Sequence, residues 1–231
     1  MEKGRIIEGL TVASLYRFPE HSLAYPLLQR YLYPWEALSQ ITEYLEELGQ
    51  ELPWATYRAM GNGVWIAEGT TVAPTAQIKG PCIIGPRSEI RHGAFIRGSV
   101  LIGADCVVGN STELKNCILF DGVQVPHYNY VGDSILGYRV HLGAGAVTSN
   151  VKSDKTLVAL RLGESRFPTG RRKIGAMIGD LSEIGCNSVL NPGTVVGREC
   201  TVYPLSSVRG YIPDAHIYKS AEQIVAKRIL E

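Results

Sequence analysis

A repeat of aliphatic residues at every sixth position limits the folds open to this chain more than any other feature. Stepping by six from Val72 to Leu114, and again from Ile178 to Val208, meets only Ile, Leu or Val. The positions are Val72, Ile78, Ile84, Ile90, Ile96, Ile102, Val108, Leu114, Ile178, Ile184, Leu190, Val196, Val202 and Val208. In a chain that is 45% apolar, such a run has a chance probability on the order of 1 in 100,000, so the period is a signal.

The spacing predicts short strands joined by tight corners. The residue after an anchor is often glycine, as at Gly85, Gly103 and Gly197, and the fourth residue after it is small. An α-helix would scatter anchors six residues apart around its circumference, whereas three short strands per turn place every anchor inside a coil. Successive turns would stack at about 4.8 Å, the ordinary strand spacing. We therefore expect an all-β fold, a hexapeptide parallel β-helix of about seven turns over residues 64–213.

The segments outside the coil have weaker patterns. Residues 1–63 form an N-terminal segment in which 34–48 predict a helix with Pro34 in its first turn and Gly49 as its stop. Residues 1–33 have no clean period. In residues 214–231, Ser220 and Gln223 match a capping box and predict a short helical tail. Both helices are expected to cover the ends of the coil, which otherwise leave strand edges unpaired.

Composition excludes several classes of partner. Twenty-three Lys and Arg residues balance 22 Asp and Glu residues, a formal net charge of +1, so no global field attracts nucleic acid or anionic lipid. No stretch resembles a membrane span or a secretion signal. The five cysteines include no Cys-x-x-Cys pair, which argues against disulfides and a zinc site and favours reduced core thiols. We expect a cytoplasmic protein with no metal, no nucleic acid and no membrane as partner.

Two irregular steps in the repeat mark the candidate site. The anchors from Leu114 to Leu119 and from Val131 to Leu136 are five residues apart rather than six. Local departures from a consistent pattern are expected at functional sites. The segment between them contains His127, and an imidazole is the side chain best suited to accept a proton near neutral pH. On position alone, a surface or packing histidine is the stronger alternative.

The sequence resembles the left-handed β-helix (hexapeptide-repeat) acyltransferases over residues 64–213. The segments that carry the resemblance are 109–115, 127–133 and 142–146, together with Asn150. They are similar to the acetyltransferase half of the bifunctional N-acetylglucosamine-1-phosphate uridyltransferase/glucosamine-1-phosphate acetyltransferase family. The left hand of the coil comes from this resemblance, since parallel crossovers are ordinarily right-handed. The resemblance also implies a homotrimer with sites at its interfaces.

The resemblance implies roles for individual residues. His127 falls on the general base that deprotonates the amine for attack on acetyl-CoA. The residues implied to bind the amino sugar phosphate are Arg97, Lys115, Asn129, Tyr130, His141 and Asn150. Ala144 falls where a backbone N–H lies near the thioester, and Cys186 lies one corner away. The family has Gly-His-Leu-Thr-Tyr where this chain has Pro126-His127-Tyr128-Asn129-Tyr130, asparagine at His141 and serine at Cys186.

A basic segment interrupts the repeat. Residues 149–173 lose the period and have a local net charge of +5, which predicts an external loop. Its residues Arg171, Arg172 and Lys173 would suit the phosphates of coenzyme A, although a solvated basic loop is nearly as good an explanation. No Leu-x-Gly-Gly-x-Gly-Thr-Arg nucleotidyltransferase loop occurs in the chain.

The sequence thus predicts an acetyl-CoA-dependent N-acetyltransferase that acts on an amino sugar phosphate or a nucleotide-linked amino sugar, without a metal. One alternative is a non-catalytic homologue that binds a sugar phosphate or nucleotide sugar and lacks the nucleotidyltransferase domain. Another is a partner subunit that docks on a separate nucleotidyltransferase through the first 60 residues.

Overall fold

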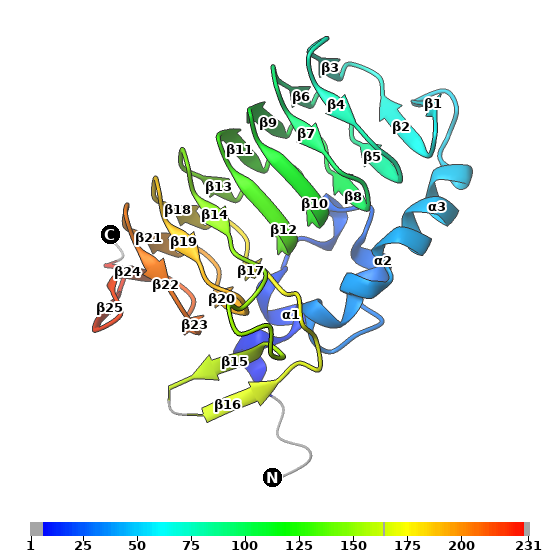
Figure 1. Ribbon diagram of the computed structural model, residues 1–231. Helices are drawn as coiled ribbons and strands as arrows, with labels where there is room; N and C mark the ends of the chain where they lie inside the picture. The colour runs from blue at the N-terminus through cyan, green and yellow to red at the C-terminus, as the bar shows by residue number, and fades with distance from the viewer. Residues whose placement is uncertain (1–6, 164, 229–231) are drawn as a thin grey trace.

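The computed structural model describes residues 7–163 and 165–228, and they form a coil of short strands with three faces (Figure 1). The first face stacks β3 (Thr71–Val72), β6 (Glu89–Ile90), β9 (Val107–Asn110), β11 (Gln124–His127), β13 (His141–Leu142), β18 (Glu183–Ile184), β21 (Thr201–Val202) and β24 (His216–Ser220). The second stacks β4 (Gln77–Ile78), β7 (Phe95–Ile96), β10 (Glu113–Leu119), β12 (Tyr130–Leu136), β14 (Val147–Thr148), β19 (Val189–Leu190) and β22 (Ser207–Val208). The third stacks β2 (Val64–Ala67), β5 (Cys82–Ile84), β8 (Val100–Ile102), the second halves of β10 and β12, β17 (Ala176–Ile178), β20 (Thr194–Val196) and β23 (Tyr211–Ile212).

The fold class is the one that the repeat and the resemblance predict, a left-handed parallel β-helix. Twelve of the fourteen aliphatic anchors are buried, with Val72 38% exposed and Ile78 half-buried in the first turn. The coil has about nine turns rather than seven, and its first face continues beyond residue 213 into β24. Four cysteines are buried in the coil, and Cys186 is exposed.

The two five-residue steps shape one edge of the coil. At each step a single strand, β10 or β12, runs across the corner between the second and third faces. The shortened corner is closed by Asn116 and Asp133, whose φ angles are 47° and 48°. Asparagine and aspartate tolerate this left-handed conformation better than most residues. The irregular repeat therefore brings two polar side chains to the same corner of neighbouring turns.

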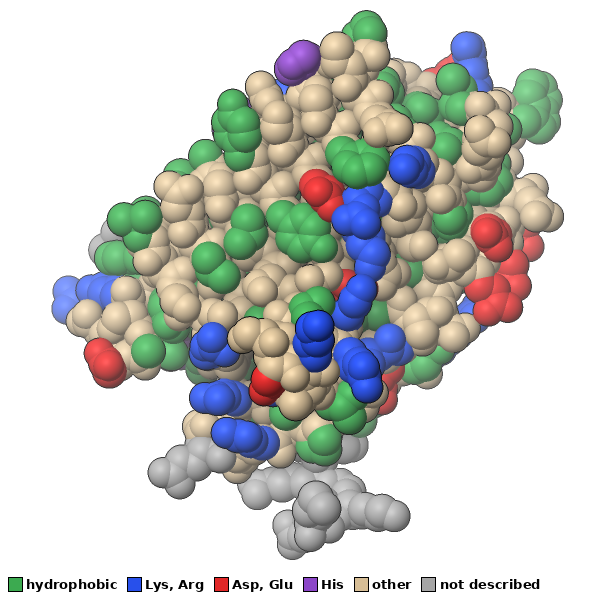
Figure 2. Space-filling view, in the orientation of Figure 1, with side chains coloured by type: hydrophobic (Ala, Val, Ile, Leu, Met, Phe, Trp, Pro, Cys, Tyr) green, Lys and Arg blue, Asp and Glu red, His purple; other side chains and the backbone are tan. Residues whose placement is uncertain are grey.

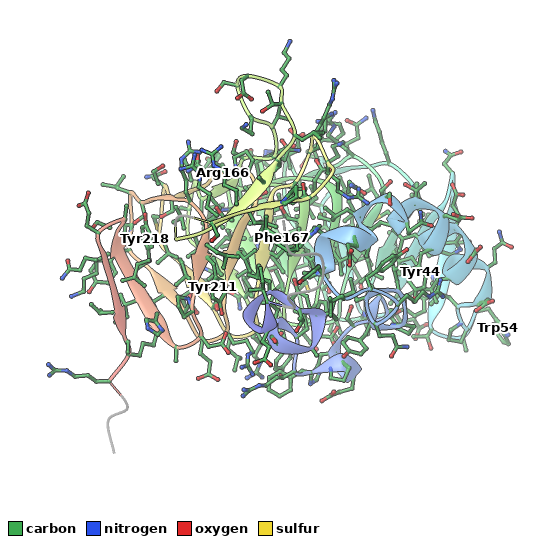
Figure 3. The ribbon with its side chains drawn as sticks, turned by 90° about the horizontal axis from the view of Figure 1, so that it is seen from below. Tyr44, Trp54, Arg166, Phe167, Tyr211 and Tyr218 are labelled. Carbon is green, nitrogen blue, oxygen red and sulfur yellow. The ribbon has the colours of Figure 1, made fainter. Side chains whose placement is uncertain are left out.

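The predicted helix near residues 34–48 is present as a 3-10 turn, η3 (Pro34–Ser39), followed by α3 (Ile41–Glu51). Gly49 lies inside α3 and does not end it. Its role is in packing, since a Cβ there would come within 2.5 Å of the Trp65 ring. The expectation that this helix covers the coil's end is wrong. It packs along the third face against β5, β8 and β10, as Figure 1 shows. Trp54, just after α3, is 90% exposed (Figure 3).

The N-terminal segment lies along the corner between the third and first faces. Its described part contains short turns, namely η1 (Glu8–Leu10), α1 (Val12–Leu15), η2 (Pro19–His21) and α2 (Tyr25–Leu28). The carbonyls of Leu15 and His21 accept hydrogen bonds from the N–H groups of Asp180 and Asp121. Tyr16 is buried and stacks on Phe120. These contacts explain why the segment has no regular hydrophobic period: its buried residues are spaced to fit the surface of the coil.

The predicted C-terminal helix is wrong. Residues 216–226 form an antiparallel hairpin of β24 and β25 (Gln223–Ala226), in which Ser220 pairs with Gln223. The strand forms because Ile217 and Tyr218 continue the ladder of β21, and the chain then turns back on that edge. At the opposite end, β1 (Tyr57–Gly61) pairs with β2. No helix among the described residues has the length and apolarity needed to cross a membrane.

Residues 149–173 leave the coil and contain a hairpin of β15 (Ala159–Leu162) and β16 (Ser165–Pro168). The hairpin is anchored rather than free: Val158 and Leu160 are buried, and Phe167 packs edge-on against Tyr33 and Trp35. Figure 3 shows Phe167 between the hairpin and the body of the molecule. The loop therefore ties the N-terminal segment to the coil.

Candidate active site

The candidate base lies at the corner between the first and second faces. Backbone N–H groups of Tyr128, Gly145 and Asn187 donate to the carbonyls of the preceding turns. Through these bonds, the corner position is occupied on successive turns by Asn110, His127, Ala144 and Cys186. Neighbouring turns of a β-sheet are about 4.8 Å apart. The structure thus stacks three residues that the sequence assigned to catalysis and to the acyl donor in one column.

Several hydrogen-bonding groups of this column, the Cys186 N–H among them, have no partner among the described residues. His127 is exposed, and in the described part of the chain no side-chain hydrogen bond engages its imidazole. The N–H of Ala144, one turn away, likewise donates to no acceptor among residues 7–163 and 165–228. A free imidazole can accept a proton, and a free N–H can stabilise a developing oxyanion. The column therefore offers a base and an oxyanion donor on adjacent turns.

A polar network covers the neighbouring second face. Asp133, whose side chain is 6% exposed, lies 3.7 Å from the Lys115 ammonium through Oδ2 and accepts a 2.8 Å hydrogen bond from the Asn116 amide through Oδ1. The Asn150 amide donates to Asp133 at 2.5 Å and to the Tyr130 hydroxyl at 3.2 Å. Three of the predicted sugar-phosphate residues are therefore joined through one buried carboxylate.

Arg97 lies on the same face as this network. Its guanidinium donates to Glu113 at 2.6 Å, and it occupies the same position of its turn as Lys79 and Lys115 do of theirs. Figure 2 shows Lys and Arg side chains in a line across this face with acidic groups beside them. The pKa of Tyr130 is raised, first by burial and then by the charge of Asp133, so its hydroxyl stays protonated at neutral pH.

Asp133, Asn116 and Glu113 were not predicted as site residues. Asp133 stands in the quoted segment 127–133, and both Asp133 and Asn116 fall within the five-residue steps. The sequence feature that could have identified Asp133 and Asn116 as site residues was therefore their position at the shortened corners. Glu113 carries no such signal, because an acidic residue before an anchor is common on a solvated face.

Two predicted substrate residues are placed elsewhere. His141 lies on the first face, where its Nδ1 is 2.7 Å from Glu183, and it shares neither the corner column nor the network. Asn129 is 2% exposed, so its amide faces the chain's own carbonyls and not the solvent from which a substrate arrives. The predicted acceptor residues are therefore divided between two faces and the interior.

The basic residues of the external loop also separate. Arg171 donates to the Glu36 carbonyl at 3.0 Å and to the Ser39 hydroxyl at 2.8 Å, so its guanidinium is engaged in holding η3. Arg172 and Lys173 are exposed. Among residues 7–163 and 165–228, no group of three or more His, Cys, Asp or Glu side chains is placed to hold a metal ion. The exposed cations and Cys186 remain the candidates for binding the acyl donor.

Comparisons with known proteins agree with the resemblance seen in the sequence. A family model described as the GMPPB C-terminal domain matches residues 78–159. The bifunctional protein GlmU of Methanococcus maripaludis is 30% identical over 200 residues, covering 85% of this chain and 48% of that protein. A bifunctional sugar-1-phosphate nucleotidylyltransferase/acetyltransferase of Sulfurisphaera tokodaii is 33% identical over 164 residues, covering 63% of this chain and 41% of that protein.

The chain spans about half the length of the curated relatives that it matches, or less. Among solved structures, the UDP-N-acetylglucosamine acyltransferase of Francisella novicida aligns with a TM-score of 0.41 at 13% identity, covering 73% of this chain and 66% of that one. By its repeat, its motifs and its named relatives, the chain fits the hexapeptide-repeat acyltransferases that its sequence resembles.

Proposed function

We propose that this protein transfers an acetyl group from acetyl-CoA to the amine of an amino sugar phosphate or a nucleotide-linked amino sugar. The observation that carries the proposal is the stacking of His127 and Ala144 on neighbouring turns of one corner, where neither the imidazole nor the Ala144 N–H has a hydrogen-bond partner among the described residues. The names of the relatives, which include an acetyltransferase activity, support the same reaction class.

The proposed reaction uses both groups of the corner. The nitrogen of the neutral amine attacks the thioester carbonyl carbon, and neutral His127 takes the proton that the nitrogen loses as the C–N bond forms. The carbonyl oxygen becomes negative and accepts a hydrogen bond from the Ala144 N–H. When the C–S bond breaks, the imidazolium returns its proton to the thiolate of coenzyme A, and the products are an amide and a free thiol.

The second-face network supports a phosphorylated acceptor. Arg97 and Lys115 carry positive charge at the same position of neighbouring turns, and guanidinium and ammonium groups are the usual phosphate ligands. Both are also paired with a carboxylate, Glu113 or Asp133. We infer that the carboxylates hold these two cations in position to bind a phosphate.

The division of the residues between two faces supports a trimer. The network of Arg97, Lys115 and Tyr130 lies on the second face, whereas His141 lies on the first, on the other side of the corner that carries His127. In a homotrimer, the second face of one copy can lie against the corner and first face of the next. Such an arrangement would close the site between subunits, as the resemblance implies.

A direct assay distinguishes this function from its alternatives. The purified chain is incubated with acetyl-CoA and either glucosamine 1-phosphate or a UDP-amino sugar, and the release of thiol is followed. Thermal shift against each ligand is measured in parallel, since a ligand that binds only the folded state raises the melting temperature. Tight binding of a sugar ligand with neither thiol release nor a response to coenzyme A would instead identify a non-catalytic binding protein. Copurification with a nucleotidyltransferase and no ligand response would identify a partner subunit.

A further inference from the structure

Asn129 stands out among the residues that face the interior at the site corner. The same position on other turns holds only small side chains, namely Ala76, Ala94, Thr112, Ala146, Ser188 and Ser206. Asn129 is the largest member of this column and is 2% exposed. Ala146, on the next turn, shows that the corner closes without a polar side chain at this position. The amide of Asn129 is therefore not required for the turn itself.

The contacts of Asn129 connect the two candidate catalytic groups. Its Oδ1 accepts a hydrogen bond of 3.1 Å from the backbone N–H of His127. Its Nδ2 donates to the carbonyls of Gly143, at 2.8 Å, and Ala146, at 3.1 Å. These two carbonyls bracket Ala144, whose N–H is the candidate oxyanion donor. One planar amide thus bonds to the backbone of the base on one turn and to both sides of the donor on the next.

The other polar residues of the column also donate to a backbone carbonyl, Ser206 to that of Tyr203 on its own turn, but they lack the bond to the corner N–H. Ser188 donates to the Tyr203 carbonyl and accepts from the Ser206 N–H, both on the following turn. Thr112 donates to the Val125 carbonyl and accepts from the Asn129 N–H. Neither bonds to the backbone of its own corner residue, as Asn129 does with His127. An amide holds a donor and an acceptor rigidly on one carbon, which suits this bridging geometry.

We propose that Asn129 is a positioning residue that fixes the His127 imidazole relative to the Ala144 N–H. This inference rests on the proposed function, because it assigns a purpose to the distance between base and oxyanion donor. A misplacement of about 1 Å between reacting groups can cost on the order of 100-fold in rate. The effect of Asn129 is therefore expected in the turnover number and not in the binding of either substrate.

The first part of the test does not depend on activity. Backbone hydrogen exchange is measured for wild type, Asn129→Ala and a matched control, Ser88→Ala. Ser88 is equally buried, donates to Gly103 and accepts from Cys106 N–H, but at another corner of the coil. Asn129→Ala should speed exchange of the His127 and Gly145 N–H groups at least tenfold, whereas Ser88→Ala should affect only the Cys106 N–H. Unchanged exchange at His127 and Gly145 would overturn the inference whatever the enzyme does.

The second part is a double-mutant cycle with acetyl transfer as the readout. Asn129→Ala should lower kcat by about 100-fold with KM for both substrates within threefold, while Ser88→Ala keeps kcat. If Asn129 acts through His127, the double variant His127→Ala/Asn129→Ala should be no more than threefold slower than His127→Ala alone. If instead the losses of kcat in the two single variants multiply in the double variant, Asn129 has a merely structural role and the inference is overturned.

A second substitution covers the case in which Asn129→Ala does not fold. Asn129→Thr introduces a threonine, the residue that Thr112 provides at the same position of the preceding turn. The threonine removes the bridging amide but still fills the space of the Asn129 side chain. It should show the same exchange pattern with a smaller loss of kcat. A wild-type chain that acetylates no amino sugar would refute the proposed function and the catalytic purpose of Asn129 together, whereas the exchange result would still decide whether the bridge exists.

Discussion

At the scale of single residues, the candidate chemistry depends on groups that the fold leaves unsatisfied. Among the described residues, neither the Ala144 N–H nor the exposed His127 imidazole has a hydrogen-bond partner. Both occur at a corner, where strand pairing is interrupted and the backbone turns outward. The regular ladder above and below fixes their separation, so the site needs no flexible element to assemble its base and its oxyanion donor.

The substitution His127→Ala tests the assignment of the base. Acetyl transfer should fall by about 100-fold to 10,000-fold, the usual contribution of a positioned general base. The melting temperature and the affinity for coenzyme A should hardly change, because the imidazole is exposed and bonds to no described side chain. Kinetics paired with thermal melting measures this; a parallel loss of stability and activity would mean that His127 is a packing residue.

Asp133→Asn tests the role of the buried carboxylate. The variant removes the charge that faces Lys115 and places an amide N–H or oxygen against Asn116 and Asn150. We expect KM for a sugar phosphate to rise at least tenfold and the free energy of unfolding to fall by about 1–3 kcal/mol, as for other broken buried networks. Asp105→Asn is the control, since its pair with Arg87 is exposed and should be nearly neutral.

At the scale of elements, the N-terminal segment and the β15–β16 hairpin hold one another against the coil. Phe167 of the hairpin packs on Tyr33 and Trp35, and Arg171 bonds to the end of η3. The contacts explain why a segment with a local charge of +5 is ordered along the coil. They also explain why three adjacent basic residues have different surroundings, with only Arg172 and Lys173 exposed.

Arg171→Ala should loosen this junction. Loss of its two hydrogen bonds to η3 is expected to cost about 1–3 kcal/mol in the free energy of unfolding and to speed tryptic cleavage within residues 152–172. Arg172→Ala is the matched control, because that side chain is exposed. Equal proteolysis of the two variants would contradict the anchoring role of Arg171.

Asp180, which binds the N-terminal segment, should make the free energy of unfolding depend on pH. Burial raises the pKa of its carboxyl to about 7, although N–H groups of Tyr138 and the N-terminal segment, and the nearby His21, oppose the shift; Glu20 adds to it. The folded state therefore holds the proton more tightly than the unfolded one. This group's contribution to the free energy of unfolding should be complete below pH 4 and be lost as the pH rises to about 7. Melting curves of wild type and Asp180→Asn between pH 5 and 8 measure it; identical slopes would refute it.

At the scale of the whole molecule, the sequence predicts the coil well because its rule is local. Each anchor such as Ile96 or Val202 needs only a corner every six residues to be buried. The ends follow no such rule. Ser220 and Gln223 match a helix cap, yet an available strand edge on β21 pairs with β24 and decides the outcome. His141 was predicted to bind the substrate, but it lies on the first face, away from the second-face network, because a motif does not state which side of a corner faces the substrate.

The site residues on two faces predict three copies in solution. Light scattering at micromolar concentration should give three times the 25.3 kDa mass of one chain. The reason is that the His127 corner and the Arg97 network face outward on different sides of a single coil. A monomer mass would remove the shared site, and acetyl transfer by that monomer would show that one copy holds the complete machinery.

The two ends of the coil differ in how well their inward side chains are buried, and this difference predicts which end unfolds first. In the first turn the inward residue Val72 is 38% exposed and Ile66 and Ile78 are only half-buried, whereas at the other end Val208, Ile212 and Tyr218 are buried. Because the turns of a solenoid are stabilised mainly by their neighbours, opening starts at the less buried terminus. Local unfolding should therefore begin at the turn that contains Ile66. The turn that contains His127 should unfold later, because several turns must open before it.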